Sequence, residues 1–237
     1  TYTKLKEHGE DMTHENESKV DPKEDRGPLD LTLLTEQYRA DLKKYQDRES
    51  LYINTENQFK QQHIPGAQFF HIDQICDQNS TLPHMLPGAD DFSKAVAALG
   101  ISNDSHVVVY DSAGLFSAAR VWWTFKVFGH QNVQVLDGGL PAWSEQGRAL
   151  ESNTRAVIKT DYVATLNSKF VINKHELIEN ISSKQYRVLD ARSKERFLGQ
   201  APEPRAGLPS GHMPESVCMS FANLIENGRL KSRQQLQ

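Results

Sequence analysis

From residue 90 onward, segments whose apolar residues recur with the period of a helix alternate with short apolar segments typical of strands. Phe92 and the apolar residues three, four and seven positions later share one face of a helix, with Asp90 as its N-cap and Gly100 just after its end. Residues 106–110, His-Val-Val-Val-Tyr, form an apolar run that is typical of a strand buried on both faces. The same criteria predict a helix over 117–128, a buried strand over 133–136 and a short helix near 141–146.

The second half of the chain repeats this alternation. Residues 151–165 lack a clear period and predict a linker, after which Asn173 would cap a helix and 187–190 would form a strand. Before residue 90, weaker patterns predict a helix over 33–45 and a strand over 50–54. Strands that alternate with helices through short loops indicate parallel βαβ units. The predicted fold class is therefore α/β, with parallel sheets flanked by helices.

Two short segments of the chain resemble each other. They are His63-Ile-Pro-Gly-Ala-Gln-Phe-Phe and His212-Met-Pro-Glu-Ser-Val-Cys-Met, and their offset (212 − 63 = 149 residues) is a plausible domain length. The loop that opens with Asp111 follows the first segment by 48 residues, so its counterpart would fall near position 260, beyond Gln237. The repeat therefore predicts two domains of one kind, the second of them incomplete.

The domain organisation follows from the repeat and from an uneven distribution of charge. Residues 1–26 hold five Lys or Arg and eight Asp or Glu with few apolar side chains, so burial cannot offset their ordering entropy. We predict a disordered charged tail over 1–28 and a first domain over 29–150. A linker over 151–165 and a partial second domain over 166–237 would follow.

Composition narrows the classes of partner and compartment. The 237 residues carry 27 Lys and Arg against 31 Asp and Glu, a net charge of −4, which offers no electrostatic footprint for nucleic acid or an anionic membrane. Two cysteines cannot build a disulfide scaffold, and no apolar run is long enough to span a membrane. The N-terminus lacks a signal-peptide pattern, so we expect a protein that is not secreted.

The loop that follows the strand at 106–110 is the natural place for a site in a parallel sheet. Its backbone N–H groups and the start of the next helix favour an anion, but Asp111 is itself negative and would repel one. We interpret Asp111 as a carboxylate that caps the helix. Cys76 and Cys218 lie outside this loop, so we interpret both as core or near-core thiols.

Two pairs of side chains could carry chemistry. Asp73 and His84 could form a carboxylate–imidazole pair for proton transfer, although their spacing alone distinguishes them from no other Asp and His. Arg196 and Arg205 flank the stiff segment Ala-Pro-Glu-Pro and could direct two guanidinium groups at one carboxylate. The alternative, two solvated arginines, stays open on spacing alone.

Several motifs, taken in order, resemble the tandem-domain rhodanese family, and within it the 3-mercaptopyruvate sulfurtransferases. The matching stretches are His63-Ile-Pro-Gly-Ala, Phe69-Phe-His-Ile-Asp73, His84-Met-Leu-Pro-Gly88, Arg120-Val-Trp-Trp123, Leu136-Asp-Gly-Gly139, Leu189-Asp-Ala-Arg192, Arg196-Phe-Leu-Gly-Gln-Ala-Pro-Glu-Pro-Arg205 and Gly211-His-Met-Pro214. Any one of them would be unspecific, whereas the ordered combination is specific.

The resemblance implies two rhodanese-like domains and an enzyme that uses no cofactor or metal. A cysteine of the second domain would take sulfane sulfur from 3-mercaptopyruvate or thiosulfate as a persulfide and pass it to cyanide or to a thiol such as thioredoxin. The family's carboxylate-binding arginines fall on Arg196 and Arg205, and its proton-relay residues fall on Asp73 and His84. A cytoplasmic or mitochondrial location would fit.

The chain also departs from the family pattern. The Cys-Gly-Ser-Gly-Val-type loop that carries the nucleophile is absent from residues 1–237, and Asp111 fits the family's non-catalytic first copy. Glu215 stands where the family has a turn glycine, which would strain the turn if the backbone there requires a positive φ. We therefore expect this chain to be inactive by itself. The alternative is a rhodanese-like module that binds or regulates without catalysis.

Overall fold

The computed structural model describes residues 55–152, 154–204 and 208–236. The predicted tail, the helix over 33–45 and the strand over 50–54 lie outside these residues. Contacts group Gln62–Gln237 into one compact unit, and the description below concerns this unit.

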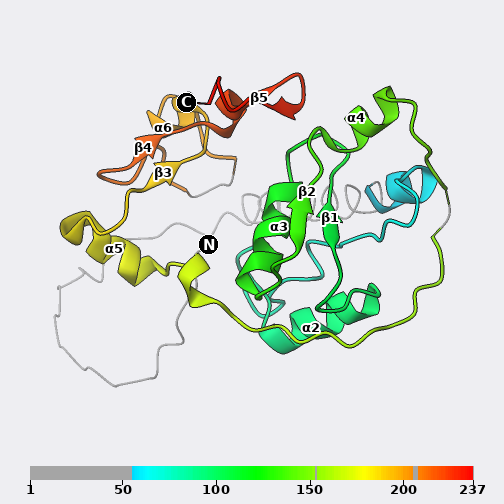
Figure 1. Ribbon diagram of the computed structural model, residues 1–237. Coiled ribbons are helices and arrows are strands. Elements are labelled where there is room, and N and C mark those ends of the chain that lie inside the picture. Colours follow the sequence, from blue (N-terminus) through cyan, green and yellow to red (C-terminus); the bar gives the residue numbers. More distant parts are fainter. Residues whose placement is uncertain (1–54, 153, 205–207, 237) are drawn as a thin grey trace, which may run out of the picture. The chain divides into compact units, whose positions relative to one another are not determined.

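The first half of this unit alternates helices and strands in the predicted order (Figure 1). Its elements are α2 (Ala89–Ala98), β1 (Val107–Val109), α3 (Ala118–Val127), β2 (Val133–Val135) and α4 (Gly139–Glu145). Strands β1 and β2 pair in parallel, with Val107 opposite Val133, and α3 packs against both. The parallel βαβ unit predicted from the sequence is confirmed.

Helix α2 begins earlier than the sequence predicts. The N-cap is Gly88 instead of Asp90, because the Gly88 carbonyl already accepts a hydrogen bond from the N–H of Phe92 at 2.9 Å. Asp90 falls in the first turn, where its charge still complements the positive end of the helix dipole. Gly100 follows the C-cap with φ +74°, as the sequence predicts.

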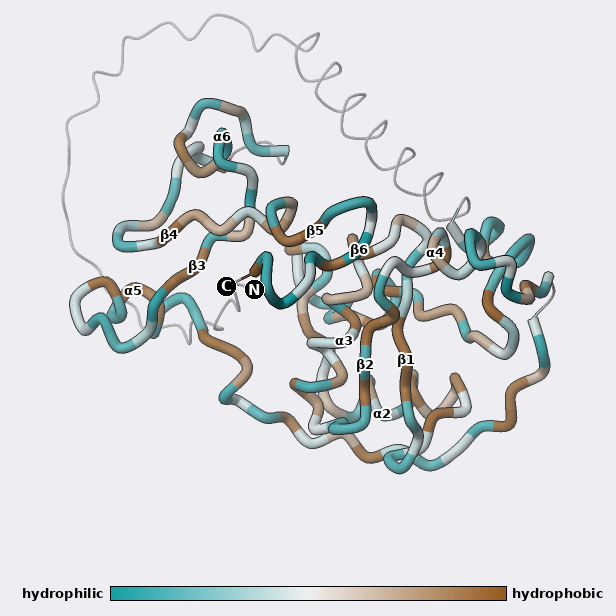
Figure 2. The backbone as a smooth tube through the Cα atoms, turned by 45° about the horizontal axis from the view of Figure 1, so that its top comes forward, coloured by the Kyte–Doolittle hydropathy of each residue, from teal (hydrophilic) through white to brown (hydrophobic). Residues whose placement is uncertain are grey.

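The prediction that the strands are buried on both faces is wrong. Val107 and Val109 of β1 pack against the core, whereas Val108 is 49% exposed. In β2, Val133 is buried and Gln134 is exposed. The reason is that the helices α2 and α3 supply the apolar cluster on one face of this pair, so successive side chains alternate between core and solvent. In Figure 2, β1 has the brown colour of apolar residues, whereas β2 combines brown with a teal, hydrophilic stretch.

An aromatic cluster forms the centre of the core. The ring of Phe92, fully buried on α2, stacks on Phe128 with centroids 4.3 Å apart and meets Phe125 edge-on at 5.3 Å. Tyr162 adds a fourth ring at 6.0 Å from Phe92. Such offset and edge-on geometries suit aromatic quadrupoles, and the burial of four rings supplies much of the hydrophobic stabilisation of this half.

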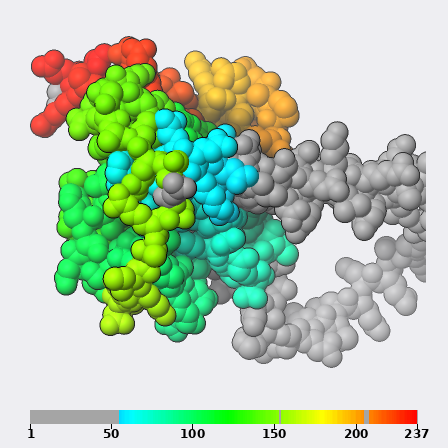
Figure 3. Space-filling model, turned by 90° about the vertical axis from the view of Figure 1, so that its right-hand side faces the viewer, coloured from blue at the N-terminus to red at the C-terminus, as the bar shows by residue number. Residues whose placement is uncertain are grey.

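The segment after residue 151 runs extended over the first half, without helix or strand among its described residues up to 167 (Figure 3). Thr160 donates its N–H to Ala97 at 3.1 Å, and the Asn103 side chain bonds both backbone groups of Val163. Because this segment does not pair with a neighbouring strand, these hydrogen bonds supply partners for its backbone N–H and C=O groups. The segment contains the predicted linker, whose role as a domain boundary stays a prediction.

The second half contains short elements, with one parallel and one antiparallel strand pair. They are η1 (Ser168–Phe170), α5 (Lys174–Ser183), β3 (Leu189–Asp190), α6 (Lys194–Phe197), β4 (Val217–Cys218), η2 (Phe221–Leu224), β5 (Ile225–Glu226) and β6 (Arg229–Leu230). Strands β3 and β4 are parallel, whereas β5 and β6 are antiparallel. Asn173 caps α5 as predicted, in a capping box with Glu176. Together with the first half, this agrees with the predicted α/β class.

The two related segments share a backbone feature. Gly66 has φ +81°, and Glu215, its counterpart 149 residues later, has φ +63°. The turn therefore requires the left-handed region in both copies, and the predicted strain at Glu215 is present. A side chain held in this region costs about 1 kcal/mol relative to glycine.

Candidate functional site

Asp73 and His84 are in direct contact. The Nε2 atom of His84 lies 2.5 Å from the Oδ1 atom of Asp73; the Asp73 side chain is only 16% exposed, whereas the His84 side chain is 37% exposed. His84 has φ +59°, an unusual backbone conformation for a residue with a side chain. A carboxylate that accepts a hydrogen bond from an imidazole fixes the tautomer and orientation of the ring, which is the arrangement for moving a proton. The structure thus brings the predicted pair together, while its role in proton transfer stays a prediction.

Arg120 of α3 holds the backbone of His84. Its Nη2 atom donates to the His84 carbonyl oxygen, and its guanidinium group lies over the Trp123 ring, 4.6 Å from the centroid. Burial lowers the pKa of Arg120 from its ordinary value. Sequence reasoning gave Arg120 no role, although the spacing of Arg120 and Trp123 on one helix face was the signal that could have found it.

Cys76 lies beside this pair but is poorly suited to act as a nucleophile. Its Sγ atom donates to the Asp73 carbonyl oxygen at 2.9 Å. Burial, reinforced by the negative charge of Asp73, raises the pKa of the Cys76 thiol. Cys218 lies in strand β4, opposite Asp190. Both thiols are partly buried and lie outside the loop at 111–116, as the sequence predicts.

The loop at 111–116 is filled by its own carboxylate. Asp111 Oδ2 accepts hydrogen bonds from the N–H groups of Phe116, Ser117 and Ala118 at 2.7–2.9 Å, and Oδ1 accepts one from Ala113 at 3.0 Å. The predicted cap of α3 is confirmed. Because these donors already face a carboxylate, the loop offers little to a second anion.

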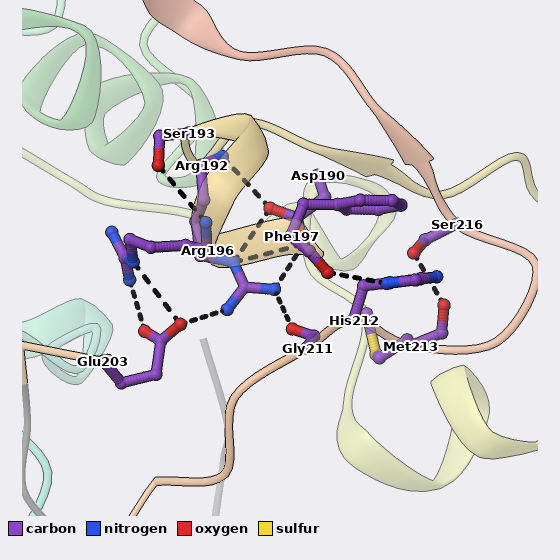
Figure 4. A network of polar contacts seen from close by, with 10 residues as sticks. All are labelled: Asp190, Arg192, Ser193, Arg196, Phe197, Glu203, Gly211, His212, Met213 and Ser216. Atoms are coloured by element: carbon purple, nitrogen blue, oxygen red, sulfur yellow. Dashed lines mark hydrogen bonds and ion pairs between the residues drawn. The ribbon is translucent and has the colours of Figure 1, made fainter. Parts of the chain in front are cut away.

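Arg196 takes part in a network of ion pairs at the end of β3 (Figure 4). The Glu203 carboxylate bonds Arg196 through Nη2 and, at 3.4 Å, through Nε. It also accepts a 2.6 Å hydrogen bond from Nη1 of Arg192. Arg192 in turn donates from Nε and Nη2 to both carboxylate oxygens of Asp190. The network therefore alternates two cations and two anions.

These contacts shift the titration of both carboxyl groups. The hydrogen bond from Arg196 holds the pKa of Glu203 below its ordinary value, and the hydrogen bond from Arg192 does the same for Asp190. Sequence reasoning expected two arginines at one carboxylate. The structure shows Arg192 and Arg196 at Glu203, whereas Arg205 lies outside the described residues. Arg192 and Glu203 were missed because their spacing of eleven residues carries no periodic signal.

The described residues contain neither a cluster of metal ligands nor a helix that could span a membrane. Within them, no three His, Cys, Asp or Glu side chains gather closely enough to hold a metal ion. None of their helices is long and apolar enough to span a bilayer.

Comparisons with known proteins place these features in a family. The family profile described as the rhodanese-like domain matches residues 36–146. Human 3-mercaptopyruvate sulfurtransferase is 40% identical over 183 residues, which cover 76% of this chain and 62% of the relative. Thiosulfate/3-mercaptopyruvate sulfurtransferase 2 of Arabidopsis thaliana is 44% identical over 197 residues, covering 74% and 58%.

A solved structure agrees with this. The yeast mitochondrial complex I sub-stoichiometric sulfur transferase subunit superposes with a TM-score of 0.69 at 33% identity, covering 77% of this chain and 67% of that one. The chain thus spans about three fifths of the length of the curated relatives it matches.

Proposed function

Because this chain belongs to the rhodanese family, we propose that it is part of a sulfurtransferase whose donor is 3-mercaptopyruvate. The relatives named above carry this donor in their names. The observation that carries the proposal is the contact between Asp73 and His84. Thiosulfate remains the second donor to be tested.

The atoms of the reaction explain why this contact matters. A cysteine thiolate would attack the sulfur of 3-mercaptopyruvate and form a persulfide, while the bond between sulfur and C3 breaks and leaves the enolate of pyruvate. The proton of the donor thiol must then finish on C3 as pyruvate forms. A histidine oriented by a carboxylate can take and return that proton. Transfer from thiosulfate releases sulfite and needs no such proton, so the pair favours 3-mercaptopyruvate.

The other roles are assigned by the same resemblance. Arg196 and Arg205 would hold the carboxylate of the donor. The nucleophile would lie in a Cys-Gly-Ser-Gly-Val-type loop, which residues 1–237 do not contain. We assign the nucleophile neither to Cys76, whose thiol has a raised pKa, nor to Cys218 within β4. The acceptor would be cyanide or a thiol such as thioredoxin, in the cytoplasm or in mitochondria.

The proton role can be tested without the nucleophile. If His84 faces C3 of a bound keto acid, residues 1–237 should catalyse the exchange of the pyruvate methyl protons with D2O, measured by NMR. The variants His84→Ala and Asp73→Asn should lose this exchange, and His175→Ala, an exposed histidine of α5, should retain it. Exchange that persists in His84→Ala, or its absence in the unmodified chain, would contradict the proposed role.

The assignment of the cysteines has its own test. Residues 1–237 should release no sulfide from 3-mercaptopyruvate above a buffer blank when dithiothreitol is the acceptor. Sulfide release that disappears in Cys76→Ser would identify Cys76 as the nucleophile and overturn our assignment.

A further inference from the structure

We propose that Glu203 is a positioning residue that fixes the orientation of Arg196 for the carboxylate of the donor. This inference rests on the proposed function, because it deepens the role of Arg196 in that site. It assigns Glu203 a part in donor binding through Arg196, without contact between Glu203 and the donor.

The contact with Glu203 uses only one edge of the guanidinium group. Nε and Nη2 of Arg196 face the carboxylate, whereas Nη1 makes no hydrogen bond within the described part of the chain. A guanidinium group has five N–H donors in a rigid plane. The Arg196 side chain is 30% exposed, so its remaining donors can reach a ligand. One carboxylate can therefore hold the group while its outer edge binds another.

Glu203 is itself fixed from several directions (Figure 4). Its side chain is only 5% exposed and bonds Arg192 as well as Arg196. Arg192 is bound to Asp190 at the end of β3 and to the Gly211 carbonyl oxygen at 2.6 Å. The prolines on either side of Glu203 restrict the backbone of its loop. Three successive ion pairs thus connect Arg196 to strand β3: Arg196 with Glu203, Glu203 with Arg192, and Arg192 with Asp190.

This geometry decides between two roles for Glu203. A competitor for Arg196 would need to leave when the donor arrives, and its removal would strengthen donor binding. Glu203 is buried, occupies the inner edge and has a second cationic partner, so we expect it to remain in place. Its removal should weaken donor binding, since a mobile Arg196 loses rotamer entropy on binding a ligand.

The experiment uses residues 1–237 and follows the Nε–H signal of Arg196 by NMR. In Glu203→Gln, solvent exchange of this N–H should accelerate by about tenfold, and the dissociation constant for pyruvate should rise by about tenfold, as for the loss of one charge-assisted hydrogen bond. Glu195→Gln removes an equal charge from an exposed neighbour on α6 and should change neither quantity by more than about twofold.

The outcomes separate the two proposals. Equal or tighter binding of pyruvate by Glu203→Gln would overturn the positioning role. If the unmodified chain binds no pyruvate, the donor site at Arg196 falls, while the exchange of the Arg196 N–H still tests whether Glu203 holds the side chain. Should Glu203→Gln fail to fold, judged by circular dichroism, Glu203→Asp provides the test. It keeps the charge but shortens its reach, so Arg196 exchange as slow as in the unmodified chain would contradict the geometry.

Discussion

Replacement of Asp111 by alanine should destabilise the protein through the start of α3. The carboxylate accepts four backbone hydrogen bonds, from Ala113, Phe116, Ser117 and Ala118. The first two N–H groups are exposed and can bond water after the replacement, whereas Ala118 is buried and Ser117 is half-buried. The cost therefore arises mainly at the last two.

The magnitude follows from these two classes of donor. Loss of a helix N-cap costs about 0.5–2 kcal/mol, and a buried donor left without a partner costs about 1–3 kcal/mol. These contributions overlap, so we expect the free energy of unfolding to fall by about 3 kcal/mol. For a unit of this size, that corresponds to a fall in Tm of about 6–12 °C.

Urea denaturation followed by circular dichroism, together with calorimetry, measures both quantities. Asp111→Asn retains one acceptor oxygen without the charge and should lose about half as much stability. Asp104→Ala is a matched control, because Asp104 is exposed and makes no side-chain hydrogen bond among the described residues; it should change stability by less than about 0.5 kcal/mol. If Asp111→Ala also stays within that limit, the carboxylate does not organise the loop and our interpretation is wrong.

Three further predictions concern other sites. Tyr162→Phe should raise Tm by about 1–3 °C, because the Tyr162 hydroxyl is buried with no hydrogen-bond partner in the described structure. Burial disfavours the phenolate and raises the pKa of Tyr162 to about 12, so the stability of the protein is unaffected by this group below about pH 10 and falls as the pH rises towards 12. A pH series of thermal melts should therefore show a smaller alkaline loss in Tyr162→Phe, and an unchanged alkaline limb would contradict this. Arg120→Ala should cost about 1–3 kcal/mol and shift the ring ¹⁵N signals of His84, and Arg120→Lys should restore little of either; unchanged ring signals would refute the contact. In Asp190→Asn, the free energy of unfolding should fall less steeply as the pH is lowered. The reason is that the hydrogen bond from Arg192 lowers the pKa of Asp190 in the folded state. The stability gained is complete above about pH 4 and is lost as the pH falls through the lowered pKa, so an identical acid limb in the variant would exclude this contribution.

The sequence predicted those elements whose signal is local. The period of apolar residues located α2, α3, β1 and β2 to within one or two residues, and the Asn173 cap located α5. The N-cap of α2 was misplaced because Asp90 is a good capping residue by type, whereas the hydrogen bond from Phe92 to Gly88 depends on the path of the incoming chain. The burial of Val108 was misjudged because a run of three valines has no period that distinguishes one face from two.

The candidate site shows the same difference between what local sequence predicts and what tertiary structure decides. Residue types and family motifs pointed to Asp73, His84 and Arg196, but their contacts depend on tertiary structure. Arg120 reaches His84 across 36 residues of sequence, and Arg192 reaches Glu203 across eleven. No propensity or spacing rule predicts such partners, because they are chosen by the packing of whole elements.

Each half of the chain has a group of N–H donors that faces an internal carboxylate, but the two carboxylates leave different numbers of donors unbonded. In the first half, the N–H groups at the start of α3 face an internal carboxylate, and Asp111 engages four of them. In the second half, Arg196 also faces an internal carboxylate, but Glu203 bonds only its Nε and Nη2 edge. An external carboxylate would meet a filled loop at Asp111 and an open guanidinium edge at Arg196. If the proposed function holds, the anionic donor would therefore bind at Arg196 in the second half, whereas Asp73 and His84 lie in the first half.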